Sequence, residues 1–94
     1  MKALRSPAAQ ATAAVIAHAR KKAGLTQREL AARVKRPHSV IGMIESDQRQ
    51  VNVPEFMDLA EAIGVDPVEL FASAYRQSRS QSAKPGRNRT RSGR

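Results

Sequence analysis

The stretch "LTQRELAARVKRPHSVIGMIES", residues 25–46, contains two short helical patterns joined by a basic connector. The first pattern opens on Thr26 and Glu29, which form a capping box: their side chains satisfy backbone N–H groups that are free at a helix start. In the second pattern the apolar residues Ile41 and Ile44 are spaced by three, which gives a narrow apolar helix face. The stretch therefore predicts two short helices that are held close together.

Three more helices are predicted around this pair. Ser6 and Pro7 suit a helix start and Gly24 suits a left-handed helix end, so one helix precedes the pair. Two helices follow it, and each begins with a predicted capping box, at residues 52–55 and 66–69. No stretch indicates a strand hairpin or a repeat of fixed period. The sequence thus predicts an all-α fold with five short helices.

Composition narrows the class of protein. With 94 residues the chain can form one domain with a modest core, which leaves little room for an enclosed active site. It contains no cysteine, so neither a disulfide nor a thiolate zinc site can form, and a reducing compartment is the default. No apolar run approaches the roughly 18 to 20 residues of a membrane span, and no catalytic or phosphate-loop motif occurs. We expect a cytoplasmic protein that is no enzyme and needs no cofactor or metal.

The net charge of +9 is concentrated near the C-terminus. Residues 76–94 carry seven basic and no acidic side chains, whereas residues 1–75 carry ten basic and eight acidic ones. Because residues 76–94 lack large apolar side chains, they cannot bury enough surface to offset the entropy of ordering. We predict a folded domain over residues 1–75 and a disordered basic tail over residues 76–94. This tail either aids solubility or binds the phosphates of a nucleic acid through its charge.

Three segments together resemble a known family. They are "GLTQRELAARV" (24–34), "HSVIGMIES" (38–46) and "LAEAIGVDPVELF" (59–71). They are similar to the helix-turn-helix domain of the lambda-repressor-like, or XRE, transcriptional regulators, over about residues 12–74. The resemblance implies a compact five-helix domain, sequence-specific binding to double-stranded DNA and usually a homodimer. It also answers why two short helices are held together: one braces against the DNA backbone while the other enters the major groove.

The groove-facing residues follow from helix geometry. If Ile41 and Ile44 face the core, steps of about 100° place Ser39, Gly42, Met43 and Ser46 on the opposite side. The flanks of that side are then His38 and Val40. The resemblance places base contacts at His38, Ser39 and Met43. We therefore interpret five residues as candidates for reading bases: His38, Ser39, Val40, Gly42 and Met43.

Other candidate DNA contacts surround this helix. By resemblance, Gln27 meets a phosphate at the start of the preceding helix, where free backbone N–H groups and the helix dipole favour an anion. The remaining candidates are basic residues near the two helices: Arg28, Lys35, Arg36 and Arg49. The resemblance also implies a structural ion pair between Arg20 and Glu45, which would lock the reading helix to the first helix.

The sequence departs from the family pattern at four positions. Arg36 stands where the family has an apolar residue. Lys35 and Asp47 stand where the family has glycine, a residue that enters positive φ freely. Gly42 lies inside the predicted reading helix, at a cost of about 1 kcal/mol relative to alanine. Either the helix approaches DNA closely at Gly42, or its reading face has degenerated.

Two classes of function fit these observations. The first is a small repressor or controller that binds a pseudo-palindromic operator as a dimer. The second is the antitoxin of a toxin-antitoxin pair, which holds a protein partner and also regulates its own operon. The last helix bears on both, because it presents Val68, Phe71, Ala72 and Tyr75. These residues either pair two subunits, or Phe71 closes the core.

Overall fold

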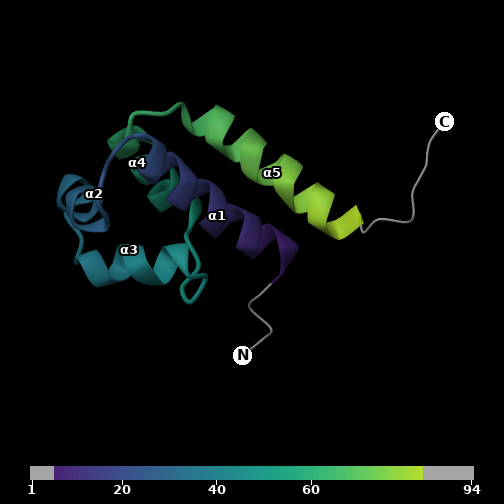
Figure 1. Cartoon of the computed structure of the whole chain (residues 1–94), viewed down its shortest axis with the longest axis horizontal. Helices are drawn as coiled ribbons and strands as arrows, with labels where there is room; N and C mark the ends of the chain where they lie inside the picture. Colours follow the sequence, from purple (N-terminus) through teal and green to yellow (C-terminus); the bar gives the residue numbers. More distant parts are fainter. Residues whose placement is uncertain (1–5, 84–94) are drawn as a thin grey trace.

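The computed structural model describes residues 6–83 of the chain. Within this range it contains five helices and no strand, so the predicted all-α fold is confirmed. The helices are α1 (Pro7–Lys22), α2 (Gln27–Val34), α3 (His38–Glu45), α4 (Val53–Ile63) and α5 (Pro67–Ala83). Figure 1 shows α3 at one edge of the molecule and α5 at the opposite edge, with α1 and α4 between them.

One hydrophobic core joins all five helices. Four fully buried side chains come from four different helices: Ile16 of α1, Leu30 of α2, Ile41 of α3 and Leu59 of α4. The fifth helix, α5, lies antiparallel to α1 along much of its length and adds Leu70 and Ala74 to the core. Because α2 and α3 each bury residues against this shared core, their relative orientation is fixed by packing.

The start of α2 has the predicted capping box. The Glu29 backbone N–H donates to the Thr26 hydroxyl at 3.0 Å, and the Thr26 N–H donates to the Glu29 carboxylate at 2.8 Å. The Thr26 backbone N–H, which favours the charged carboxylate, lowers the pKa of Glu29. Both hydrogen bonds define where α2 begins.

The other two predicted capping boxes are only half formed. At α4 the Asn52 side chain accepts from the Glu55 N–H at 2.8 Å, but the Glu55 carboxylate does not return to Asn52. At α5 the Asp66 side chain accepts from the Val68 N–H at 2.9 Å. The prediction of a reciprocal box at α4 is wrong because the Glu55 carboxylate meets two arginine side chains instead.

The two departures at the family's glycine positions have a structural consequence. Lys35, which ends α2, has φ 58°, and Asp47, in the loop after α3, has φ 60°. Both lie in the left-handed region, which costs residues with a Cβ about 1–2 kcal/mol. The Lys35 N–H donates to the Ala32 carbonyl at 3.2 Å, which closes the end of α2 despite this cost.

The helix α5 is longer than the sequence predicts. It ends at Ala83, so the expected disorder of residues 76–83 is wrong. Gln77 and Ser78 are half-buried and continue the face that Leu70 and Ala74 bury along α1. An established helix extends easily, because each added residue contributes one more backbone hydrogen bond. The rest of the predicted tail, residues 84–94, lies outside the described residues.

No helix in the part of the chain that the structure describes is long and apolar enough to cross a membrane.

Candidate nucleic-acid interface

The helix α3 has one buried and one exposed face. Ile41 and Ile44 are buried, whereas His38, Ser39 and Met43 are exposed, as helix geometry predicts. The turn that joins α2 to α3 spans only residues 35–37, so the two helices stay in contact while the outer face of α3 is open. This exposed face has the position that a helix needs in order to enter a groove of DNA.

The start of α2 borders one flank of α3. The Gln27 side-chain amide donates to the Glu45 carboxylate at 3.0 Å, which ties the first turn of α2 to the last turn of α3. A Cβ added to Gly42 would lie 3.6 Å from the Gln27 side-chain oxygen, an ordinary van der Waals distance. Gly42 is therefore half-buried beside Gln27, and packing within the protein does not require a glycine there.

The predicted ion pair of Arg20 and Glu45 is present. The Arg20 Nε donates to the Glu45 carboxylate at 2.6 Å and Nη2 donates to its other oxygen at 2.9 Å. Arg20 Nη1 also donates to the Leu25 carbonyl at 2.7 Å. The hydrogen-bonded Glu45 carboxylate raises the pKa of Arg20. Since the two side chains are only 9% and 7% exposed, the pair is a buried connection between α1, α3 and the loop before α2.

A second ion-pair site borders the other flank of α3. The Arg49 guanidinium donates to both oxygens of the Glu55 carboxylate, at 3.0 and 3.1 Å, and Arg36 Nη1 lies 3.4 Å from the same carboxylate. Glu55 is 7% exposed, whereas Arg36 and Arg49 are 45% and 34% exposed. The hydrogen-bonded Glu55 carboxylate raises the pKa of Arg49. We call these residues the Glu55 cluster: Arg36, Arg49 and Glu55.

Sequence reasoning missed the Glu55 cluster. Glu55 lies three residues after Asn52, a spacing typical of a capping box, and this local interpretation hid its role. The available signal was that two arginines, Arg36 and Arg49, lie in the two loops that flank α3. Only the packing of the helices around the shared core brings these loops to one carboxylate.

The ten candidate DNA contacts divide by exposure. Six are exposed: Arg28, Lys35, Arg36, His38, Ser39 and Met43. The other four are half-buried: Gln27, Val40, Gly42 and Arg49. Val40 packs against the core next to the Glu55 cluster, so less of its side chain faces outward than helix geometry alone suggests. The outermost surface of α3 is therefore formed by His38, Ser39 and Met43.

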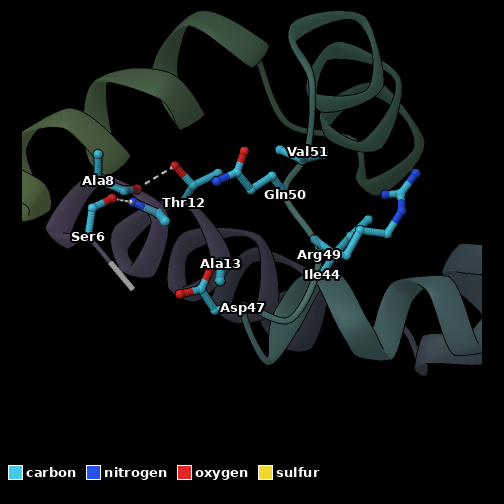
Figure 2. A pocket seen from close by; sticks show the side chains of 10 residues that line it. Ser6, Ala8, Thr12, Ala13, Ile44, Asp47, Arg49, Gln50 and Val51 are labelled. Atoms are coloured by element: carbon cyan, nitrogen blue, oxygen red, sulfur yellow. Dashed lines mark hydrogen bonds between the residues drawn. The ribbon is translucent and has the colours of Figure 1, made fainter. Parts of the chain in front are cut away.

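A pocket of about 270 Å³ lies between the start of α1 and the loop after α3. Figure 2 shows residues of both segments that line it, among them Thr12 and Ala13 of α1 and Asp47 and Gln50 of the loop. Asp47 is buried, and among the described residues its Oδ2 has no hydrogen-bond partner. The pocket thus offers one buried carboxylate oxygen without a partner, and no group of three or more potential metal ligands occurs in residues 6–83.

Large apolar side chains are exposed on α4 and α5. Figure 1 shows α5 at the edge of the molecule opposite α3. Phe71 is 61% exposed and stacks on Tyr75, with 6.4 Å between the ring centroids. The alternative that Phe71 closes the core is therefore wrong. We call this surface the α4–α5 apolar face; its exposed residues are Val53, Met57, Val68, Phe71 and Tyr75.

This arrangement of α2, α3 and their short connecting turn defines a helix-turn-helix domain. A family model described as helix-turn-helix matches residues 16–70. The chain is also similar to a solved structure, an XRE-family like protein from Pseudomonas syringae pv. tomato str. DC3000. The two are 40% identical with a TM-score of 0.69, over 73% of this chain and 84% of that one. No curated protein matches the chain.

The chain therefore belongs to the XRE-family helix-turn-helix proteins, a family of DNA-binding regulators. The predicted resemblance and the predicted fold class are confirmed.

Proposed function

We propose that this protein is a small sequence-specific transcriptional regulator, a repressor or controller, that inserts α3 into the major groove of DNA. The observation that carries the proposal is the exposed face of α3 between two polar flanks, the start of α2 and the Glu55 cluster. A helix of this exposure fits a groove about 12 Å wide, and flanks of this kind meet the phosphates on either side. Because such a regulator binds DNA inside the cell, we propose that it is located in the cytoplasm.

The residues of the outer face have different roles in this proposal. His38 donates to a guanine acceptor or to a phosphate, and Ser39 can donate or accept at a base edge. Met43 contacts the methyl group of a thymine. None of these side chains has the rigid two-donor geometry of arginine, so direct readout supplies less of the affinity than phosphate contacts do.

The phosphate contacts come from the flanks of α3. Gln27 lies in the first turn of α2, where backbone N–H groups and the helix dipole favour an anion. Four basic residues extend this surface: Arg28, Lys35, Arg36 and Arg49. The net charge of +9 supports the same role, since phosphate neutralisation drives binding that is independent of sequence.

A second copy of the chain is the proposed occupant of the α4–α5 apolar face. Five large apolar side chains exposed on one surface exceed what a monomer of this size needs, and pairing there leaves α3 of each copy free for DNA. Sedimentation of the whole chain at tens of micromolar is expected to show a dimer, and Phe71→Asp is expected to shift it to monomer. A wild-type protein that stays monomeric contradicts this proposal.

The same observation keeps the antitoxin function as the second candidate. The α4–α5 apolar face contains a groove of about 530 Å³, which also suits a protein partner such as a toxin. In that case a purified partner binds the wild type and not Phe71→Asp, while DNA binding by α3 is unchanged.

A selection of random duplexes with the wild-type protein tests the main proposal. A defined preferred sequence is expected, and His38→Ala or Ser39→Ala should reduce its advantage over random DNA by roughly 1 to 3 kcal/mol while leaving the salt dependence nearly intact. Arg28→Ala is the matched control: it should weaken binding to all duplexes alike. If no sequence is enriched, or if the α3 variants bind like wild type, the proposal fails.

A further inference from the structure

The Glu55 cluster joins two loops that lie on either side of α3 in the sequence. Arg36 is in the turn before α3 and Arg49 is in the loop after it, yet both guanidinium groups reach the carboxylate of Glu55 on α4. Glu55 itself is buried beneath them. One carboxylate thus sets the positions of two cationic groups along the same flank of the reading helix.

The geometry leaves both arginines able to meet a phosphate. Arg49 uses two of its five N–H donors on Glu55, and Arg36 forms a single ion pair at 3.4 Å. Both side chains remain partly exposed, and the cluster keeps a net charge of +1 because one carboxylate faces two guanidinium groups. The exposed side of the cluster is therefore cationic.

The side-chain cap of α4 does not use the Glu55 carboxylate, although an acidic residue in the first turn also suits the helix dipole. The Asn52 side chain already caps this helix by accepting from the Glu55 N–H, and the Glu55 carboxylate contributes nothing to that cap. Free arginine side chains have many rotamers, and ordering them on binding costs affinity. A carboxylate that holds them in place beforehand removes part of this cost.

We propose that Glu55 is a positioning residue for DNA recognition: it presets Arg36 and Arg49 as paired phosphate contacts and thereby sets the register of α3 in the groove. The inference rests on the proposed function, because it assumes that α3 reads DNA. Beyond that function, the proposal states that the preference of the protein for one DNA sequence over another depends on Glu55, a residue that does not itself contact the bases. A small error in the position of a bound helix weakens every base contact it makes.

Glu55→Gln tests this proposal, since it keeps the size of the side chain and removes its charge. The probes are the duplex that the wild type selects and a scrambled duplex of equal length. Glu55→Gln is expected to reduce the ratio of the two affinities about tenfold, and to steepen the dependence of log K on log salt by up to about 0.9 as the arginines lose their counter-charge. Glu61→Gln is the matched control, because Glu61 is exposed on the same helix and its substitution changes the net charge equally. It should leave the ratio unchanged.

A cycle of variants shows whether Glu55 acts through the arginines. In an Arg36→Ala/Arg49→Ala background, Glu55→Gln is expected to have no further effect on the affinity ratio. A folded Glu55→Gln protein with the wild-type ratio overturns the proposal, as does a tenfold loss that persists in this background. If Glu55→Gln does not fold, Arg49→Lys replaces it: this variant keeps the charge but loses the paired hydrogen bonds, and an unchanged ratio overturns the proposal. A wild type that does not prefer its selected duplex refutes the proposed function itself.

Discussion

Two ion-pair sites flank the reading helix, and they differ in which partner is buried. At Arg20 and Glu45 both side chains are buried, whereas in the Glu55 cluster only the carboxylate is buried and the arginines reach the surface. Removing one partner of a fully buried pair leaves the other charge buried without a counter-charge or water. An exposed arginine that loses its partner is solvated by water instead, at little cost in free energy. Breaking the first site is therefore expected to cost more stability than breaking the second, and the arginines of the second site are suited to contacts outside the protein.

The largest effect is expected from breaking the buried pair. Arg20→Ala should lower the free energy of unfolding by about 3–5 kcal/mol, because it leaves the Glu45 carboxylate buried with only Gln27 as a side-chain partner. Chemical denaturation of Arg20→Ala, Glu45→Ala and the double variant measures the effect. The double variant should lose much less than the sum of the two single losses. Additive losses would show that the two residues do not act as a pair.

A smaller effect, of opposite sign, is expected on the flank that holds the buried pair. Gly42→Ala should raise the free energy of unfolding by up to about 1 kcal/mol, because alanine favours a helix and the added methyl only touches Gln27. Urea denaturation checks the stability. The same variant decides why a glycine stands there: weaker DNA binding by this more stable protein indicates close approach to DNA, and unchanged binding indicates that the reading face does not use Gly42.

The smallest change in stability is expected at the exposed site. Arg49→Ala should lower the thermal unfolding midpoint only slightly, because Arg36, at 3.4 Å, remains as a counter-charge for the buried Glu55 carboxylate and Arg49 itself is partly solvated. Its effect should instead appear in DNA binding, as a shallower salt dependence with a slope reduced by about 0.9. A loss of stability as large as that of Arg20→Ala would erase the difference between the two sites.

Local features of the fold could be predicted from the sequence. The capping box of Thr26 and Glu29 is present, and the two positions that lack the family's glycine take positive φ. The buried face of α3 also follows from the spacing of Ile41 and Ile44. These features depend on backbone groups and side chains within about one helical turn of each other, so a local pattern contains the information needed.

Features that depend on distant residues could not be predicted in the same way. The partners of Glu55 come from two loops, and a local pattern assigned its carboxylate to a helix cap instead. The pair of Arg20 and Glu45, 25 residues apart, was expected from the family resemblance and not from local spacing. The extension of α5 to Ala83 could not be predicted either, because residues 76–83 are mostly polar. They stay helical because they continue a helix that already packs along α1.

The sequence by itself determined five helices, where most of them begin and end, and which face of α3 is exposed. Hydrogen bonds at helix ends and the helical period involve residues only a few positions apart, so they can be recognised from local patterns in the sequence. The tertiary structure alone decided that Phe71 is exposed, that Gln27 bonds Glu45 and that Arg36 and Arg49 share Glu55. These contacts depend on how α1, α3 and α4 pack around one core, because only packing brings residues from separate helices and loops within hydrogen-bond distance.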